Sequence, residues 1–218
     1  MQAVYSFCRM IKKIVDTFKP EYISIIWDSR GKTTRHEMFQ NYKATRQAPP
    51  SDLFVQKEYI VKFLDLIGMK QVATQGIEAD DIIFSIAQEQ KKAGNTVVMI
   101  TSDKDMGQAI EDDIVVMFDP WKDTFLNQTA FEAKMGFAVS KLPFYFAILG
   151  DTSDNIPGVK GIGEKGALDL VKQFASVQDM YERIDLVAKE RTKAALLANK
   201  DNAFLSHKLL IKPSTYSM

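Results

Sequence analysis

The sequence has almost no cysteine, no excess of charge of either sign and no long apolar segment. A single cysteine, Cys8, among 218 residues excludes an internal disulfide framework and fits a reducing compartment. Basic and acidic residues number 28 each, so no global field points to a nucleic acid, although charges of each sign can still be segregated on the surface. No apolar run reaches the ~18 residues of a membrane-spanning helix. Residues 1–15 lack the basic-then-apolar order of a signal peptide. We therefore expect a cytoplasmic protein with no membrane partner.

Helical and strand-like segments alternate along the first half of the chain. Short β-branched runs such as YISIIWD and TVVMITS are typical of strands buried on both faces, and they are separated by segments with helical spacing of apolar residues. The expected elements are helix 1–18, strand 22–28, helix 51–67, strand 70–74, helix 78–93, strand 96–102 and strand 113–119. This order predicts an α/β domain over residues 1–126, with a mostly parallel sheet flanked by helices. Residues 127–218 predict a helical subdomain.

Acidic residues recur directly after the predicted strands. They are Asp28, Glu78, Asp80, Asp81, Asp103 and Asp105. Because ligands of open α/β sheets bind at the carboxyl ends of strands, we expect these acids to converge. Carboxylates held close together raise one another's pKa unless cations neutralise them, and oxygen ligands suit Mg²⁺ or Mn²⁺. Most of these acids, taken alone, are better explained as helix caps or dipole partners, and only their joint placement favours a metal site.

Residues 149–170, LGDTSDNIPGVKGIGEKGALDL, are the most specific segment of the chain. Asp151 and Asp154 lie three residues apart in a turn, so both can face one cation. Glycines and lysines then precede a helix that starts near Glu164; they are Gly158, Lys160, Gly161, Gly163 and Lys165. Glycines let backbone N–H groups approach a phosphate, and a helix N-terminus adds a favourable dipole. A plain turn would explain the glycines alone, but the lysines and the flanking apolar helices favour a helix-hairpin-helix that binds duplex DNA without reading its sequence.

Four motifs carry a resemblance to a known family. They are IIWDSRGKTTRHEMFQNYKATR, GIEADDIIFSIA, ITSDKDMGQ and LGDTSDNIPGVKGIGEKGA, in this order. The sequence resembles the 5′ nuclease family, the 5′→3′ exonuclease and flap endonuclease domain found at the N-terminus of bacterial DNA polymerase I and as stand-alone proteins. The resemblance covers the chain from about residue 1 to residue 210.

The resemblance implies roles for individual residues. The acids that match the family's first metal cluster are Asp28, Glu78, Asp80 and Asp81. The acids that match those completing this cluster and building a second are Asp103, Asp105, Asp151 and Asp154. The segment that matches the helical arch, about residues 32–50, contains Arg35, Tyr42, Lys43 and Arg46. The arch passes a single-stranded 5′ end, and Lys43 would polarise the scissile phosphate while Arg46 steadies it. Residues 150–175 would contain the helix-three-turn-helix, which binds the duplex and a K⁺ ion through backbone carbonyls.

These roles imply a two-metal hydrolase with Mg²⁺ or Mn²⁺, acting on flaps, nicks or RNA primers in replication and repair. A non-catalytic DNA-binding module and a generic phosphatase-like metalloenzyme are the alternatives. Family members normally begin with a strand that ends in a metal-binding aspartate, ahead of the point where this match starts. Three explanations compete: a wrongly assigned start codon, a truncated or degraded gene, or a chain that works without those residues. We expect an artefact of the gene start or a fragment, and a chain that binds DNA and metal yet cleaves poorly.

Four aromatic and histidine side chains are candidates either for packing or for contact with a nucleic acid. Trp27 is expected to pack in the core rather than stack on a base. Phe39 fits either role. His36, beside Arg35 in the arch, is a candidate phosphate contact, whereas His207 is expected on a helix surface.

Overall fold

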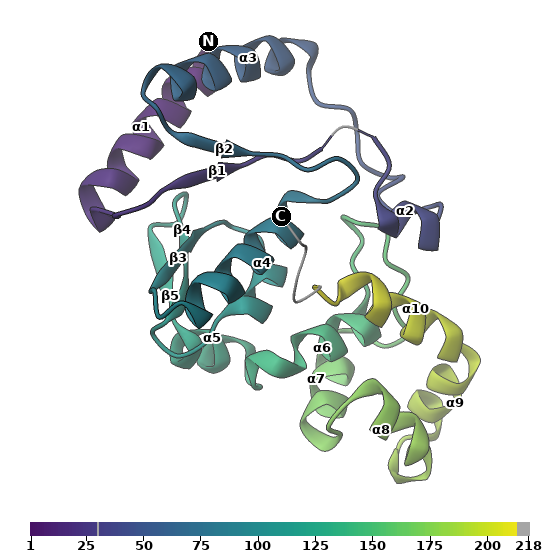
Figure 1. Cartoon of the computed structure of the whole chain (residues 1–218). Coiled ribbons are helices and arrows are strands. Elements are labelled where there is room, and N and C mark those ends of the chain that lie inside the picture. Colours follow the sequence, from purple (N-terminus) through teal and green to yellow (C-terminus); the bar gives the residue numbers. More distant parts are fainter. Residues whose placement is uncertain (30, 213–218) are drawn as a thin grey trace. The chain divides into compact units, whose positions relative to one another are not determined.

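The computed structural model describes residues 1–29 and 31–212, and it divides into two compact units (Figure 1). Unit 1 contains residues 1–33 and 47–82. Unit 2 contains residues 34–46 and the chain from residue 83 onward. Helix α4 (Ala79–Lys92) begins in the first unit and continues in the second.

Unit 1 is a thin layer of two helices and a two-stranded parallel sheet. Its elements are α1 (Gln2–Phe18), β1 (Ser24–Ile26), α3 (Ser51–Leu66) and β2 (Lys70–Val72). Figure 1 shows α1 and α3 side by side, and the contact between them buries Ile11, Ile14, Ile60 and Leu64. Every residue of β1 stays at least partly exposed, so the prediction of a strand buried on both faces is wrong here.

The sheet of unit 2 has three strands in the order β3–β4–β5. They are β3 (Val97–Ile100), β4 (Val115–Asp119) and β5 (Thr124–Leu126). β3 pairs with β4 in parallel and β4 pairs with β5 antiparallel. All residues of β4 are buried, as expected of a central strand made of valine, methionine and phenylalanine. β5 was not predicted, because three residues are too few to show a period.

The structure therefore shows a mixed α/β fold that is mostly helical and has two small sheets. The expected α/β class is confirmed, and two of the three strand pairings, β1–β2 and β3–β4, are parallel. Within residues 1–29 and 31–212, however, the strands form two sheets rather than the single sheet that was expected. No described strand pairs with both β1–β2 and β3–β5. The alternation of elements along a sequence indicates their local order, whereas backbone pairing decides which strands share a sheet.

The rest of unit 2 is helical. Its elements are α2 (Thr34–Met38), η1 (Lys104–Ala109), α5 (Gln128–Met135), η2 (Val139–Lys141), α6 (Leu142–Leu149), α7 (Glu164–Gln173), α8 (Val177–Glu182), η3 (Ile184–Leu186), α9 (Glu190–Ala198) and α10 (Lys200–Leu210). Among the described residues, no helix is both long enough and apolar enough to cross a membrane.

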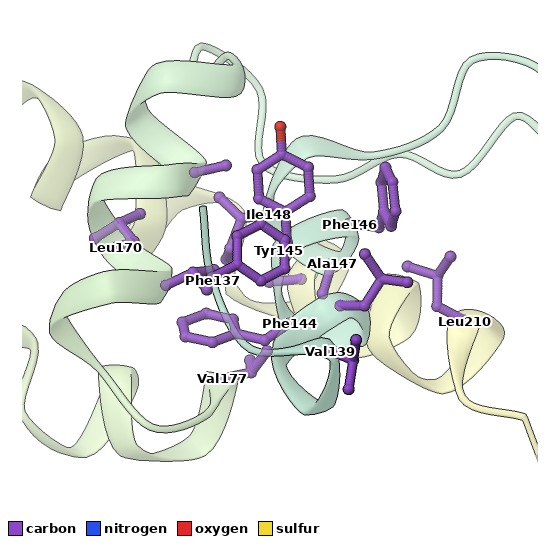
Figure 2. Close-up of a cluster of buried hydrophobic side chains, with 14 of the residues drawn as sticks. Phe137, Val139, Phe144, Tyr145, Phe146, Ala147, Ile148, Leu170, Val177 and Leu210 are labelled. Atoms are coloured by element: carbon purple, nitrogen blue, oxygen red, sulfur yellow. The ribbon is translucent and has the colours of Figure 1, made fainter. Parts of the chain in front are cut away.

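Helix α6 is the centre of the core of unit 2. Its sequence LPFYFAIL buries six of eight side chains, and α7 and α10 pack against it. Figure 2 shows Phe144 and Ile148 of α6 in one cluster with Leu170 of α7, Val177 of α8 and Leu210 of α10. Full burial of one such side chain contributes about 1.5–3 kcal/mol. The loops at both ends of α6 are thus held by a well-packed helix.

Candidate functional site

The loop that follows α6 is closed on itself. Asp151 and Ile156 form an antiparallel bridge, with N–O distances of 3.0 Å and 2.7 Å. The Asp151 carboxylate accepts hydrogen bonds from the backbone N–H of Ser153 at 2.8 Å and from its hydroxyl at 2.5 Å. Loop 151–156 is therefore a compact support for the two predicted metal ligands, Asp151 and Asp154.

A close backbone crossing ties this loop to the segment before α7. A Cβ atom added to Gly158, which has φ +59°, would lie 2.4 Å from the nitrogen of Gly150. The Gly158 N–H donates to the Ser206 hydroxyl at 3.0 Å, and Gly158 is buried. The prediction that Gly158 contacts DNA is therefore not supported by the structure, because its N–H is used inside the protein. Gly158, which has no Cβ, instead allows its backbone to pass directly against that of Gly150.

Asp103 and Asp105 lie at the start of η1, directly after β3. The Asp103 carboxylate accepts from the Asp105 N–H at 2.9 Å, which caps η1. The Oδ1 atom of Asp105 is buried and has no hydrogen-bond partner. Burial, together with the negative charges of Asp103 and Asp151, raises the pKa of Asp105 to about 7, although Lys212 and Lys104 oppose the shift. A buried carboxylate oxygen without a donor is a suitable ligand for a cation.

A cavity of about 580 Å³ in unit 2 brings predicted site residues together. Its acidic lining residues are Asp103, Asp105, Asp119, Asp151 and Asp154. Its basic lining residues are Arg46, Lys104, Lys122 and Lys134. Four of the predicted metal ligands thus face one cavity, together with one of the two predicted phosphate-binding cations.

Asp119 is a cavity residue that sequence reasoning missed. It ends β4, so its place after a strand was the available signal. Its Oδ1 accepts from the N–H groups of Trp121 at 3.0 Å and Lys122 at 3.2 Å. Burial opposes ionisation, but these backbone hydrogen bonds prevail and lower the pKa of Asp119. Asp119 is therefore a charged cap of the turn between β4 and β5.

Asp154 is surrounded by residues of the predicted arch. Its carboxylate forms ion pairs with Arg46 and with Lys43, whose Nζ lies 3.7 Å away, and accepts from the Tyr42 hydroxyl at 3.2 Å. The Lys43 N–H donates to the Asp154 carbonyl at 2.9 Å. The structure therefore places both predicted phosphate-binding cations beside a predicted metal ligand.

The oxygen donors of the cavity fit a hard divalent cation, but they are not closed around one. Within residues 1–29 and 31–212, no three acidic, histidine or cysteine side chains are grouped closely enough to hold a metal ion. Asp154 is engaged with Lys43 and Arg46, and the Asp103 carboxylate caps η1. The cavity fits a divalent cation because its acidic residues offer oxygen ligands and because the buried Oδ1 of Asp105 has no hydrogen-bond partner.

Unit 1 brings its own predicted ligands to the start of α4. Asp28 is exposed, and its Oδ1 accepts from the Ala79 N–H at 2.8 Å. Glu78 is 4% exposed and accepts from the Thr33 hydroxyl at 3.3 Å. Asp81 is 1% exposed, whereas Asp80, the remaining predicted ligand, is partly exposed. Burial of acids at this depth needs partners, which is consistent with ligand roles.

Two of the predicted arch residues lie in the interior. Arg35 is 4% exposed, and its Nε donates to the Leu209 carbonyl near the end of α10 at 2.7 Å. The prediction of Arg35 as a DNA contact is not supported, because the guanidinium is held inside unit 2. Tyr42 is 4% exposed and packs edge-on against His36, with ring centroids 5.3 Å apart. Tyr42 thus supports the arch segment from inside.

The loop before α7 leaves its backbone open. Gly161 has φ +91° and is exposed, as are Lys160 and Lys165. Gly163 precedes α7, and no side chain caps this helix. The first N–H groups of a helix lack partners within it, so an uncapped and exposed start can accept an anion.

The remaining aromatic and histidine predictions are resolved as packing contacts. The Trp27 ring stacks on Phe7 with ring centroids 6.3 Å apart, and its Nε1–H donates to the Gln71 side-chain oxygen at 2.8 Å. Trp27 is therefore used for packing inside unit 1, as expected, rather than for stacking on a base. Phe39 packs against the core of unit 2. Burial lowers the pKa of His207, which is half-buried rather than on a helix surface.

Two family models together cover the chain. The model for the 5′-3′ exonuclease N-terminal resolvase-like domain matches residues 1–136. The model for the 5′-3′ exonuclease C-terminal SAM fold matches residues 137–212.

Curated relatives are similar over almost the whole chain. A 5′-3′ exonuclease of Buchnera aphidicola subsp. Schizaphis graminum is 37% identical over 214 residues, which are 95% of this chain and 74% of the relative. A DNA polymerase I of Caldicellulosiruptor bescii is 36% identical over 212 residues, or 95% of this chain, but the chain spans only 25% of that protein.

Among solved structures, the T5 D15 protein co-crystallised with metal ions has a similar fold. It superposes with a TM-score of 0.82 and 23% identity, covering 95% of this chain and 82% of that one. A T5 D15 flap endonuclease in a pseudo-enzyme-product complex with DNA and metal ions gives a TM-score of 0.80 at 23% identity, covering 95% of this chain and 80% of that one.

Proposed function

Because the chain belongs to the 5′-3′ exonuclease family, we propose that it is a metal-dependent 5′→3′ exonuclease and flap endonuclease that hydrolyses phosphodiester bonds of DNA or RNA primers. The observation that carries this proposal is the cavity in unit 2, where four acids of the predicted ligand set lie with Arg46, beside Lys43. Replication and repair of DNA are the expected setting, in the cytoplasm.

The acids would hold divalent ions, with Mg²⁺ or Mn²⁺ suited to oxygen donors. The proposed ligands in unit 2 are Asp103, Asp105, Asp151 and Asp154. The proposed ligands in unit 1 are Asp28, Glu78, Asp80 and Asp81. Two divalent ions, when bound, lower the pKa of a water and stabilise the charge that develops on the phosphate. The protein then supplies position and charge, and no side-chain nucleophile is required.

Lys43 and Arg46 are proposed to bind the scissile phosphate. In the structure both cations are paired with Asp154, so they lie next to a proposed ligand. A carboxylate that coordinates a cation interacts less strongly with neighbouring ammonium and guanidinium groups. Lys43 and Arg46 would then turn to the phosphate and stabilise its charge in the transition state. The guanidinium of Arg46, 54% exposed in its side chain, suits bidentate contact with phosphate oxygens.

The start of α7 is proposed to bind the duplex. Gly161 and Gly163 leave the backbone accessible, and the uncapped helix adds a partial positive charge. Lys160 and Lys165 add contacts to the sugar–phosphate backbone that do not depend on base sequence. A K⁺ ion bound by backbone carbonyls of the same loop belongs to this proposal, and replacement of K⁺ by Li⁺ tests it through the affinity for duplex.

The test is cleavage of a labelled 5′-flap duplex in Mg²⁺ by the wild-type chain and by Asp80→Ala. We expect short 5′ products, formed slowly, from the wild-type chain and none from the variant, with duplex binding retained in both. Binding of the duplex without cleavage by the wild-type chain would instead show a non-catalytic DNA-binding module. Neither binding nor cleavage would overturn the proposal altogether.

A further inference from the structure

Residues 41–46 rest on loop 151–156 through backbone and side-chain hydrogen bonds. The Asn155 side-chain amide donates from Nδ2 to the Asn41 carbonyl at 2.6 Å. The Lys43 N–H donates to the Asp154 carbonyl at 2.9 Å. Some 110 residues of chain separate the two segments, since the Asn155–Asn41 bond spans 114 positions. The segment's own backbone hydrogen bonds form turns, such as the bond from the Ala44 N–H to the Asn41 carbonyl at 3.1 Å, and the contacts with loop 151–156 fix where these turns lie.

Asn155 is well suited to transmit the position of the loop to this segment. Its φ is +54°, in the left-handed region, which asparagine tolerates better than most residues do. Its own N–H points back to the Thr152 carbonyl at 3.4 Å, within the loop closed by the Asp151–Ile156 bridge. The side chain is thus fixed at its base by a tight turn, and its amide reaches across to the segment that carries Lys43.

We propose that Asn155 is a positioning residue of the reaction, whose amide holds residues 41–46 so that Lys43 and Arg46 stay beside loop 151–156. The catalytic part of this inference rests on the proposed nuclease function. Asn41 lies two residues before Lys43, so a shift of the Asn41 carbonyl shifts the backbone from which the Lys43 side chain extends. A misplacement of about 1 Å can lower a rate about 100-fold, which is why a single amide can matter.

Two substitutions isolate the amide. Asn155→Gly keeps the left-handed backbone free of strain and removes the side chain. Asn155→Asp also tolerates this backbone and keeps the shape, but its side chain has no N–H, and as a carboxylate it has no hydrogen to donate. We expect both variants to lower kcat about 10- to 100-fold with little change in KM. Asn199→Asp is the matched control, because the Asn199 amide makes the same kind of bond, to the Ala195 carbonyl at 2.8 Å, elsewhere in unit 2.

A double-mutant cycle tests whether Asn155 acts through Lys43. When Lys43 is already replaced by alanine, Asn155→Gly should lower kcat by much less than it does in the wild-type background. Full additivity would mean that Asn155 matters only for folding or for another group, and it would overturn the inference.

Hydrogen exchange gives a readout that needs no activity. The Lys43 amide is bonded to the Asp154 carbonyl, and we expect Asn155→Gly to speed its exchange while amides of β4 stay unchanged. Unchanged exchange at Lys43 would overturn the inference even if the wild-type chain cleaves DNA. Absence of cleavage by the wild-type chain would sink the proposed function instead, and faster exchange at Lys43 would then still support the positioning by Asn155.

Discussion

The two compact units support their acidic residues in different ways. In unit 2, Asp103 follows a strand that pairs with the fully buried β4, and Asp151 follows the buried helix α6. In unit 1, Asp28 follows β1, a three-residue strand with no buried residue. A site on rigid, buried elements keeps its geometry without a ligand, whereas a site on a thin support gains most of its order when a ligand binds.

The largest expected effect tests whether both acid sets take part in catalysis. Asp151→Ala in unit 2 and Asp80→Ala in unit 1 should each lower cleavage of a 5′-flap duplex more than about 100-fold, because even outer partners of metal ligands contribute about 10- to 100-fold. Initial rates at saturating Mg²⁺ measure this. Asp201→Asn, an exposed acid of α10, serves as the control and should cleave normally. A normal rate for Asp80→Ala would restrict the site to unit 2.

A second experiment compares the packing of the two units through two leucines with 0% exposure, Leu142 in unit 2 and Leu64 in unit 1. Leu142→Ala should lower the free energy of unfolding by about 3–5 kcal/mol and Leu64→Ala by about 2–3 kcal/mol, since Leu142 belongs to the main core cluster, Leu64 lies outside it, and a smaller core can collapse around a cavity more easily. Denaturation in urea, followed by circular dichroism, measures both. Equal losses would show that unit 1 is packed as rigidly as unit 2.

The pKa of Asp105 predicts how metal binding depends on pH. The folded state raises this pKa from 3.8 to about 7, so it binds the proton more tightly than the unfolded chain does. Without metal, the stability that this group contributes is therefore complete below about pH 4 and is lost as the pH rises to about 7. A bound cation needs the carboxylate, so affinity for Mn²⁺ should rise up to about tenfold per pH unit below pH 7 and then level off.

Titration calorimetry with Mn²⁺ between pH 5.5 and pH 8.5 checks this pH dependence. Asp105→Asn should remove most of the slope and should stabilise the metal-free protein at pH 8. A slope that persists in Asp105→Asn would assign the proton to another group.

The smallest expected effect concerns duplex binding by unit 2. Lys160→Ala and Lys165→Ala should each weaken duplex binding several-fold and lower the slope of log affinity against log salt by about 1. Fluorescence anisotropy at several salt concentrations measures the slope. Lys172→Ala, at the other end of α7, is the matched control. An equal change for Lys172→Ala would show a diffuse charge effect rather than contacts at the start of the helix.

Much of the local structure could be predicted from the sequence. The periodicity of apolar residues predicted α1, α3 and α4 to within a residue or two, because these segments are long. The start of α7 at Glu164 was also expected, since glycines and a lysine precede a regular helix. The division of the strands into two sheets could not be predicted. That β1 pairs only with β2 depends on tertiary contacts, which the local sequence does not encode.

The acids were singled out as candidate ligands from their positions in the sequence, but their surroundings could not be predicted. Burial of Arg35 and the use of the Gly158 N–H by Ser206 depend on α10, which lies far along the chain. Asp119 was passed over although it ends the predicted strand 113–119, and this position was the signal that could have identified it as a residue of the cavity. Tertiary contacts of this kind decide whether a polar residue faces a substrate or a neighbouring helix.

The crossing of Gly150 and Gly158 has a consequence for where a substrate is cut. It joins loop 151–156 to the segment that precedes α7 so closely that no methyl group fits between Gly150 and Gly158. Loop 151–156 and the segment before α7 are therefore fixed to each other at this crossing. If the start of α7 holds a duplex as proposed, the distance from there to the cut would be set by the protein, and it would limit the length of the product.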